Sequence, residues 1–453
     1  MASPSVQGRW CWPCWAEVQT RAGSAGSLSS ILLAHAPFLV ALGFFLIGLI
    51  RLGHPSEFDF DEQFYVPAAV NLAKATGVFN REHPMLSKEI MALVMTVFGY
   101  GPVPWRLGSL LFATLGLAGF ARAASTWTGQ PKVGLYVALL LAGNLLLLGM
   151  ARLANPEPYL FGFIGLAMAA MARFSRSGGT AWLAVAGVML GCATACKWSA
   201  APVIAALILL FSIRFRRSPA RIAQGLGLLG VLPVLVYFAT FLPGAFMTKD
   251  ALPVSDWFAM HLVMLEFHRG YFPPNPYNSN WLDWIAGRGA IWGVIGQPDG
   301  VWRAHLLAFN PLQAPILAVA GLVGVASAVR RDWELAVPAI TFAALLAFWA
   351  VSGRDNQFLY YFLVPAAFAT VSLAILIDRV RLHPLLKAGC VMLLVLPTAW
   401  AWPVLTMAPL KSERDIDRYT RLPGWQVHEQ NLSYPEDRLE WIDTCLPHPR
   451  RCV

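Results

Sequence analysis

A long apolar run, LLAHAPFLVALGFFLIGLI at residues 32–50, is followed closely by an acidic segment, EFDFDEQFY at residues 57–65. The apolar run has about the 20 residues that an α-helix needs to cross the hydrocarbon core of a bilayer. Carboxylates next to such a run are costly unless they have a partner or a function. The two segments together predict a membrane helix that leads directly into a functional loop.

The composition extends this prediction to the whole chain. Of its 453 residues, 57% are hydrophobic and 13% are charged, whereas soluble domains carry about 25% charged residues. Seven cysteines spread over this length do not make a disulfide framework. The first apolar run has no small-residue cleavage site after it, so we interpret it as an anchor and not as a signal peptide. The sequence therefore indicates an integral, multi-pass membrane protein.

Eleven apolar segments are candidate membrane spans. They fall near residues 30–50, 106–121, 133–150, 157–172, 180–196, 200–213, 222–243, 305–329, 335–351, 357–377 and 384–405. If the N-terminus is cytoplasmic, every short loop on the inner side is basic, as the positive-inside rule requires. The net charge of +9 thus reflects orientation in the inner (plasma) membrane and does not indicate a nucleic-acid partner.

Two further apolar segments, 61–76 and 86–100, are better interpreted as helices lying in the membrane interface. Counting residues 86–100 as a span would invert the orientation of every later span and place the basic loops outside. The expected organisation is a cytoplasmic tail (1–29), a transmembrane catalytic domain (30–405) with large external loops at 53–105 and 244–304, and an external C-terminal tail (406–453).

Five stretches of the chain resemble, in order, the motifs of one family. They are FDEQFYVPAA at 60–69 with EHPMLSK at 82–88, WRLGSLL at 105–111, LGCATACKWSA at 190–200, FHRGYFPPNPYNSNWLDW at 267–284 and GRDNQFLYYFLVPAAFA at 353–369. Together they look like the protein O-mannosyltransferases, glycosyltransferase family 39. The usual HPPLGK pattern is HPMLSK here, the usual HPY is Asn275-Pro276-Tyr277, and the soluble lumenal domain of the eukaryotic enzymes is missing, so the resemblance is to the bacterial type.

The resemblance implies an all-α polytopic GT-C glycosyltransferase with about 11 transmembrane helices. Such an enzyme transfers a sugar, expected to be mannose, from a polyprenyl-phosphate carrier to Ser or Thr hydroxyls of exported proteins, by a single inverting displacement at the outer face. The implied partners are the lipid-linked donor, an exported acceptor protein that a secretion channel could deliver, membrane lipids and a second subunit in a dimer. No cofactor is expected to be required, and a divalent metal has no support in the sequence.

The chemistry needs a base for the acceptor hydroxyl and cations for the departing phosphate. The resemblance implies Asp61 as the base and Glu62 as its neighbour, and one carboxylate beside another raises a pKa. Glu57 and Asp59 have no counterpart in the family pattern and are interpreted as ordinary loop charges.

Four cations are candidates for binding the carrier phosphate: Lys88, Arg106, Lys197 and Arg354. Three of these residues have a simpler alternative. Lys197 could extend to the membrane interface, Arg106 could mark the start of a span, and Arg354 could pair with Asp355.

The remaining candidates for the substrate site are polar or aromatic residues of the same motifs: Tyr65, His83, Asn155, Glu157, His268, Tyr277 and Trp281. Asn155 and Glu157 could equally belong to an ordinary Asn-Pro turn, and the aromatic residues could form an interfacial belt. His261 and His268 stand seven residues apart beside Glu266, but this spacing fits no strong metal-ligand pattern, so no metal site is expected.

Two pairs of cysteines are left open. Cys445 and Cys452 could form a disulfide in the external tail, and Cys11 and Cys14 in CWPC have a redox-like spacing that we interpret as incidental on a cytoplasmic tail.

Two other functions were weighed. The aminoarabinose transferases that modify lipid A share the fold and the external Asp-Glu pair but take a glycolipid acceptor, and they follow the pair with Lys-Pro-Pro. The Glu82-His83-Pro84 segment favours the protein acceptor. A secondary transporter would carry ionisable residues near mid-span in broken helices, whereas this chain gathers them at the outer ends of its spans.

Overall fold

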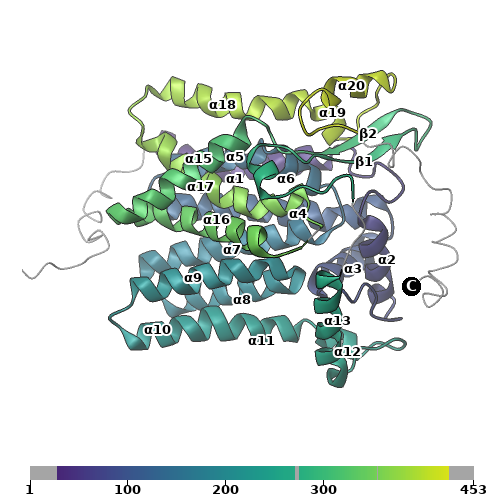
Figure 1. The fold of residues 1–453 in the computed structure, drawn as a ribbon, viewed down its shortest axis with the longest axis horizontal. Coiled ribbons are helices and arrows are strands. Elements are labelled where there is room, and N and C mark those ends of the chain that lie inside the picture. The colour runs from purple at the N-terminus through teal and green to yellow at the C-terminus, as the bar shows by residue number, and fades with distance from the viewer. Residues whose placement is uncertain (1–27, 271–274, 355, 428–453) are drawn as a thin grey trace, which may run out of the picture.

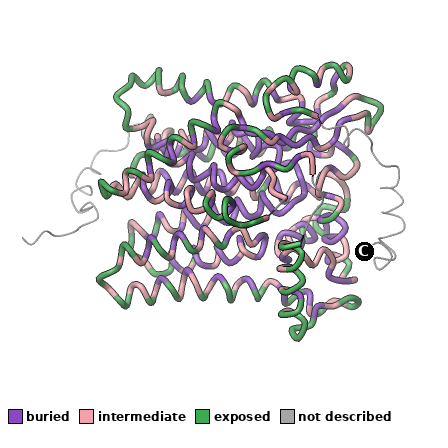
Figure 2. Tube along the Cα trace, viewed as in Figure 1, coloured by how far each residue is buried: buried purple, intermediate pink, exposed green. Residues whose placement is uncertain are grey.

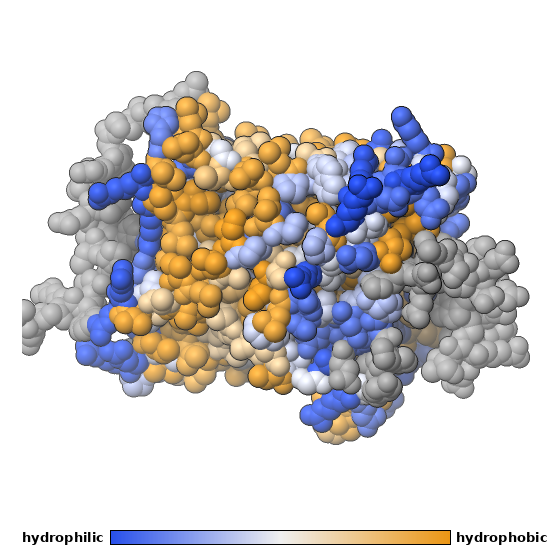
Figure 3. All heavy atoms as spheres, turned by 45° about the horizontal axis from the view of Figure 1, so that its top comes forward, coloured by the Kyte–Doolittle hydropathy of each residue, from blue (hydrophilic) through white to orange (hydrophobic). Residues whose placement is uncertain are grey.

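A computed structural model describes residues 28–270, 275–354 and 356–427 (Figure 1). Long helices run side by side along the long axis of the molecule, and a group of short helices and one β-hairpin gathers at one end of this bundle. A hydrophobic band covers the bundle between two more hydrophilic ends (Figure 3). The arrangement is that of a mostly helical, multi-pass membrane protein.

Seven helical stretches of the described residues are long and apolar enough to cross a membrane. They are α1 (Leu28–Leu49), α4 (Pro102–Thr128), α7 (Pro156–Ser177), the continuous stretch α10 (Pro219–Gly225), a π-helical turn (Leu226–Val231), α11 (Leu232–Ala239) and α12 (Leu242–Ala245), then α15 (Gln313–Ser327), α16 (Trp333–Val351) and α17 (Leu363–Arg379). Four shorter apolar helices lie between them: α5 (Pro131–Ala142), α8 (Thr180–Cys196), α9 (Ala201–Arg214) and α18 (Pro384–Trp400). These stretches overlap the eleven apolar segments expected from the sequence, although their limits differ at 133–150 and 305–329.

Glycines allow α4 and α7 to approach closely at the centre of the bundle. A Cβ on Gly119 would lie 2.4 Å from the carbonyl carbon of Gly165, and one on Gly162 would lie 2.6 Å from the carbonyl oxygen of Phe112. Small residues at such crossings are the usual way for membrane helices to pack backbone against backbone. This contact fixes the start of α7, where Asn155 and Glu157 lie, against the start of α4, where Arg106 lies.

The two helices expected in the first external loop are present as α2 (Glu62–Ala73) and α3 (Leu86–Phe98). One side of α3 exposes Leu93, Val97 and Phe98, each more than 60% accessible. An apolar exposed side suits a helix that lies at a membrane surface.

The expectation of an all-α fold is wrong in one place. An antiparallel hairpin pairs β1 (Ile291–Gly296) with β2 (Arg303–Leu307), with Ile291 opposite Leu307. The predicted span from residue 305 therefore begins at α15 instead. Every residue of β2 is buried, and a strand buried on both faces has the same continuous apolar pattern as the start of a helix.

The C-terminal part of the described chain packs on this hairpin. Trp302 pairs with Leu410, and the indole of Trp292 donates to the carbonyl of Trp425 over 2.9 Å. The short helices α19 (Trp402–Leu405) and α20 (Arg414–Thr420) complete the layer. Buried residues therefore extend from the bundle to the hairpin (Figure 2). The remaining helices are α6 (Leu145–Met150), α13 (Trp257–Arg269) and α14 (Trp281–Ile285).

Candidate active site

Asp61 immediately precedes α2 and is half-buried among other charged groups. Burial, and then the Glu157 carboxylate, raise the pKa of Asp61 from 3.8 to about 7, although Lys197 opposes the shift. The preceding residue, Phe60, has φ of 49°, a left-handed conformation that is costly for a residue with a Cβ and is typical of functional sites. Asp61 is thus a carboxyl group that can exchange a proton near neutral pH.

Glu157 and Lys197 form a buried ion pair next to Asp61. Glu157 lies in the first turn of α7, and Lys197 follows the last residue of α8 in an extended conformation that ends the helix. The Lys197 ammonium lies 4.4 Å from the ring centroid of Tyr361 and 5.2 Å from that of Tyr360. The lysine therefore does not extend to the membrane interface but points into the protein.

Aromatic and imidazole rings form a wall beside these charges. The ring of His83 lies 5.5 Å from Tyr65 and 5.3 Å from His268, centroid to centroid. Arg354 lies 2.9 Å from Nδ1 of His268. Burial, and then Arg354, lower the pKa of His268 to about 4, and burial lowers the pKa of His83 well below its usual value. Both imidazoles are therefore neutral at pH 7 and can accept hydrogen bonds.

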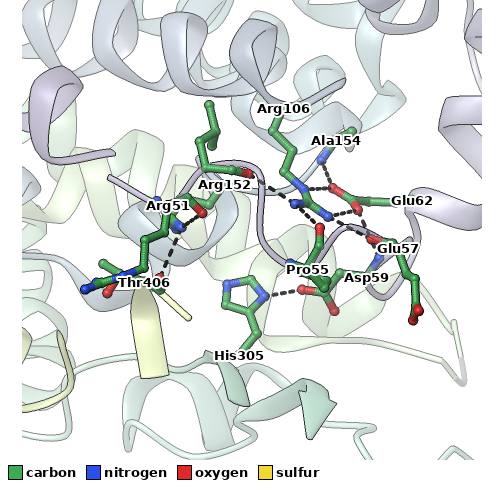
Figure 4. Close-up of polar contacts among 11 residues, drawn as sticks. Arg51, Pro55, Glu57, Asp59, Glu62, Arg106, Arg152, Ala154, His305 and Thr406 are labelled. Carbon is green, nitrogen blue, oxygen red and sulfur yellow. Dashed lines mark hydrogen bonds and ion pairs between the residues drawn. The ribbon is translucent and has the colours of Figure 1, made fainter. Parts of the chain in front are cut away.

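Glu62 faces Arg106 and is fully buried with it (Figure 4). Nε and Nη2 of Arg106 each donate to a different oxygen of Glu62 over 2.7 Å. The same guanidinium also donates to the carbonyls of Leu52, Pro55 and Glu57. A bidentate pair of this kind fixes geometry as well as adding energy, so the arrangement supports Glu62 and Arg106 in positioning the loop that carries Asp61.

Lys88 is also enclosed by backbone. Its ammonium donates to the carbonyls of Asn80 over 2.5 Å and His83 over 2.9 Å, and burial lowers its pKa to about 7. Lys88 therefore holds the turn that presents His83.

Asp59 and His305 form a contact that the sequence did not predict. His305 of β2 pairs with the Asp59 carboxylate, and neither side chain is more than 2% exposed. A Cβ on Gly293 of β1 would lie 2.2 Å from Oδ1 of Asp59. We expected Asp59 to be an ordinary loop charge, but both strands of the hairpin hold its side chain. The two residues are 246 positions apart, so no local sequence pattern could have paired them.

The other expected residues are arranged around this centre. Asn155 caps α7, because its side-chain oxygen accepts from the Glu157 amide over 3.0 Å. This is the ordinary Asn-Pro turn that was the alternative to a role in the substrate site. Tyr277 is buried and Trp281 begins α14; their segment joins the Arg354 loop because the Ser279 amide donates to the Gln357 carbonyl over 2.8 Å.

The histidine weighed as a metal ligand and the two cysteine pairs are considered next. His261 lies 2.8 Å from the Tyr237 hydroxyl and 2.5 Å from the Trp257 carbonyl. Among the described residues, no group of three or more His, Cys, Asp and Glu side chains could hold a metal ion. The CWPC segment and the Cys445–Cys452 pair lie outside the described residues.

A small pocket adjoins the Glu157–Lys197 pair. Its walls come from α7, α16, α17 and the turn before α17, and they include Leu160, Leu345, Trp349, Tyr361 and Val364. A mainly apolar pocket that ends at a buried ion pair suits an amphiphile with a charged head.

The comparisons with known proteins agree with these features. The family model for dolichyl-phosphate-mannose-protein mannosyltransferase matches residues 82–244. The polyprenol-phosphate-mannose–protein mannosyltransferase of Mycobacterium tuberculosis (strain ATCC 25618 / H37Rv) is 24% identical over 457 aligned positions, which cover 81% of this chain and 86% of that protein. The chain is therefore similar to this protein mannosyltransferase family over most of its length. The relative in Corynebacterium glutamicum is also 24% identical, over 70% of this chain and 76% of its own length.

Two solved structures have a similar fold. The Saccharomyces cerevisiae protein O-mannosyltransferase Pmt1–Pmt2 complex bound to the sugar donor matches with a TM-score of 0.74 at 12% identity, over 94% of this chain and 96% of that one. ArnT from Cupriavidus metallidurans bound to undecaprenyl phosphate matches with a TM-score of 0.54 at 16% identity, over 84% of this chain and 66% of that one. The first matches almost the whole of both chains.

Proposed function

We propose that this chain transfers mannose from a polyprenyl-phosphate carrier to Ser or Thr hydroxyls of exported proteins at the outer face of the plasma membrane. The names of the curated relatives support the donor and the protein acceptor. The observation that carries the proposal is the Asp61 carboxyl, with its pKa near 7, beside the Lys197–Glu157 pair. A general base works best when its pKa lies near the operating pH.

In the proposed reaction, the acceptor oxygen attacks the anomeric carbon of mannose while Asp61 takes the hydroxyl proton. The bond between that carbon and the phosphate oxygen breaks in the same step, and the carrier phosphate leaves with the electron pair. Attack opposite to the leaving group inverts the anomeric configuration. Lys197 and Arg354, which both lie near the ring of Tyr361, would stabilise the negative charge of the phosphate.

The pocket beside Glu157 is the proposed place for the start of the polyprenyl chain. Its apolar walls suit isoprene units, and Lys197 lies where the phosphate would be. Tyr65, His83 and His268 then line the side toward the sugar. Arg106 and Lys88, which were expected to bind the phosphate directly, are proposed instead to position the loops, because backbone carbonyls surround both.

We also propose that all eleven apolar helices cross the membrane, with the N-terminus in the cytoplasm and the hairpin outside. The short loops between α4 and α5, α7 and α8, α9 and α10, α15 and α16, and α17 and α18 then lie inside. The expected limits of the tail at 1–29, the catalytic domain at 30–405 and the C-terminal region at 406–453 are retained as part of this proposal, as is a dimer.

The test is transfer of radiolabelled mannose from polyprenyl-phosphate-mannose in membranes that express the wild type, Asp61→Asn or Glu57→Gln. Glu57→Gln is a matched control because it removes a carboxylate from the same loop, and the Glu57 side chain points away from the network (Figure 4). Label is expected in protein for the wild type and the control, and to fall by at least 100-fold for Asp61→Asn.

Two results would contradict the proposal. Label that enters only lipid would exclude the protein acceptor and favour a glycolipid acceptor. Full activity of Asp61→Asn would remove Asp61 as the base, whatever the acceptor.

A further inference from the structure

One helix of the candidate site, α13, is attached to the rest of the chain by few buried side chains. It lies crosswise to the long helices at the end of the bundle, beside the end of α11 (Figure 1). Of its 13 residues, all of them described, Met260 and Met264 are buried, whereas Phe258 and Leu262 are exposed (Figure 2). The place of His268, in the last turn of α13, therefore depends on a small set of contacts.

One of these contacts is a cage of aromatic rings around His261. The ring of Trp198 is stacked on the imidazole at 6.1 Å between centroids. The rings of Tyr237, Phe238 and Phe241 lie 5.3 to 5.5 Å from it. Distances of this size are those of aromatic rings in contact. His261 therefore joins α13 both to α11 and to the turn between α8 and α9.

A chain of hydrogen bonds runs through this cage in one direction. The indole N–H of Trp198 can only donate, so the Tyr237 hydroxyl oxygen accepts from it over 2.9 Å. The Trp257 carbonyl can only accept, so Nδ1 of His261 donates to it over 2.5 Å. Nε2 of the neutral imidazole is left to accept from the Tyr237 hydroxyl over 2.8 Å. Each polar group of the cage thus has a partner among apolar ring faces.

The same cage adjoins the candidate active site. Trp198 directly follows Lys197, and its ring lies 5.9 Å from that of His268. His268 follows His261 by seven residues, or two turns of a helix, so both imidazoles lie on the same side of α13. A shift of α13 at His261 therefore also shifts His268 relative to His83.

We propose that His261 and Tyr237 are positioning residues for the transfer reaction, because their hydrogen bond holds α13 where His268 lines the sugar side of the site. This role rests on the proposed function, in which that side belongs to the mannose of the donor. A misplacement of about 1 Å can cost on the order of 100-fold in rate. Neither residue touches the reacting atoms, so the loss of either acts through His268.

Transfer kinetics in detergent, with the donor and a soluble acceptor peptide, test this role. His261→Phe keeps a ring in the cage but leaves the Tyr237 hydroxyl without its acceptor. The value of kcat is expected to fall about 10- to 100-fold, with a smaller change in KM. Tyr237→Phe should have the same effect, and the double variant should be no worse than either single variant, because both remove the same hydrogen bond.

Two further variants separate positioning from general damage to the fold. His261→Gln offers the Tyr237 hydroxyl a carbonyl oxygen in place of Nε2, so it should recover most of the lost kcat. The matched control is Leu262→Phe, which adds the same ring at the neighbouring exposed position and should leave kcat unchanged.

A second measurement follows α13 itself and does not depend on the reaction. Met264 is fully buried, so Met264→Cys in a background without native cysteines should react slowly with a maleimide in detergent. Adding His261→Phe leaves a hydroxyl unsatisfied in the cage and is expected to raise the labelling rate about tenfold. Adding Leu262→Phe should leave the rate unchanged.

Two outcomes would overturn the proposal. Labelling of Met264→Cys that is as slow with His261→Phe as without it would show that the hydrogen bond does not hold α13. Fast labelling together with the kcat of the wild type would show that transfer does not depend on the position of α13. Absence of transfer by the wild type would instead refute the proposed function, and the labelling rates would still decide whether His261 holds α13.

Discussion

Asp61 is expected to make the protein more active and less stable. Its raised pKa means that the folded chain disfavours the ionised carboxylate, so its contribution to stability is full below pH 3.8 and is lost as pH rises through about 7. At pH 8 the ionised group costs at most about 4 kcal/mol. Asp61→Asn is therefore expected to raise the melting temperature in detergent more at pH 8 than at pH 5, while transfer is lost. A lower melting temperature at pH 8 would contradict the burial of this charge.

The same pKa predicts the pH dependence of transfer. Below about pH 7 the Asp61 carboxyl carries a proton and cannot accept another. The value of kcat/KM is expected to rise about tenfold per pH unit below 7 and to level off above it, as measured with a soluble acceptor peptide and donor in detergent. An unchanged profile between pH 5 and 8 would exclude a base with this pKa.

Gly293 tests whether the hairpin positions the catalytic loop. Gly293→Ala would place a Cβ 2.2 Å from the Asp59 carboxylate, which must then move together with the neighbouring Asp61. We expect kcat to fall by about 10- to 100-fold with a smaller change in KM. Asp59→Ala removes the clash, so the double variant should be no worse than Asp59→Ala alone.

Additive losses for these two substitutions would show that they act independently. The control is Gly389→Ala on α18, where nothing lies within 4 Å of the added Cβ.

At the scale of elements, one arginine connects two segments of backbone that are far apart in the chain. Arg152, between α6 and α7, donates to the carbonyls of Gly48 and Ile50 over 2.7 Å, where α1 ends. It also donates to the carbonyls of Arg51 and Thr406 (Figure 4). A lysine cannot replace this planar fork of donors. Arg152→Lys is therefore expected to lower the apparent free energy of unfolding by about 2–4 kcal/mol, measured by thermal unfolding in detergent.

The matched control for this substitution is Arg216→Lys at an exposed loop position. A loss of stability no larger than that of the control would mean that water replaces the Arg152 contacts.

Helices were easier to predict from the sequence than their contacts. Apolar length located each long helix, and the two helices expected at 61–76 and 86–100 are present as α2 and α3. The hairpin was missed because β2 is apolar on both faces. Among the site residues, family motifs indicated Asp61, Lys197 and His268, which are close neighbours in the fold.

The partners of those residues could not be predicted, because pairing depends on contacts between distant segments. His305 is an unremarkable histidine in sequence, and the carbonyls that surround Lys88 and Arg106 have no sequence signature at all. Arg106 and Lys88 therefore resembled phosphate ligands, although the structure surrounds them with backbone.

At the scale of the whole molecule, the orientation can be tested with cysteines in a background without native cysteines. Arg216→Cys in the loop between α9 and α10 and Gln297→Cys at the hairpin are both exposed positions. In intact cells, a membrane-impermeant maleimide is expected to label Gln297→Cys strongly and Arg216→Cys at least tenfold less, because the basic loops face the cytoplasm. Labelling of Arg216→Cys without permeabilisation would invert the proposed topology.

The contacts of the C-terminal layer also determine when the site can form during synthesis. The loop with Asp61 emerges from the ribosome among the first sixty or so residues, but the hairpin that holds Asp59 follows more than two hundred residues later. Thr406 and Met407, which accept from Arg152 and Arg303, come last, after α18. A nascent chain thus carries its proposed base through most of its insertion without the groups that fix its position. We therefore expect transfer activity only in chains that extend beyond α18.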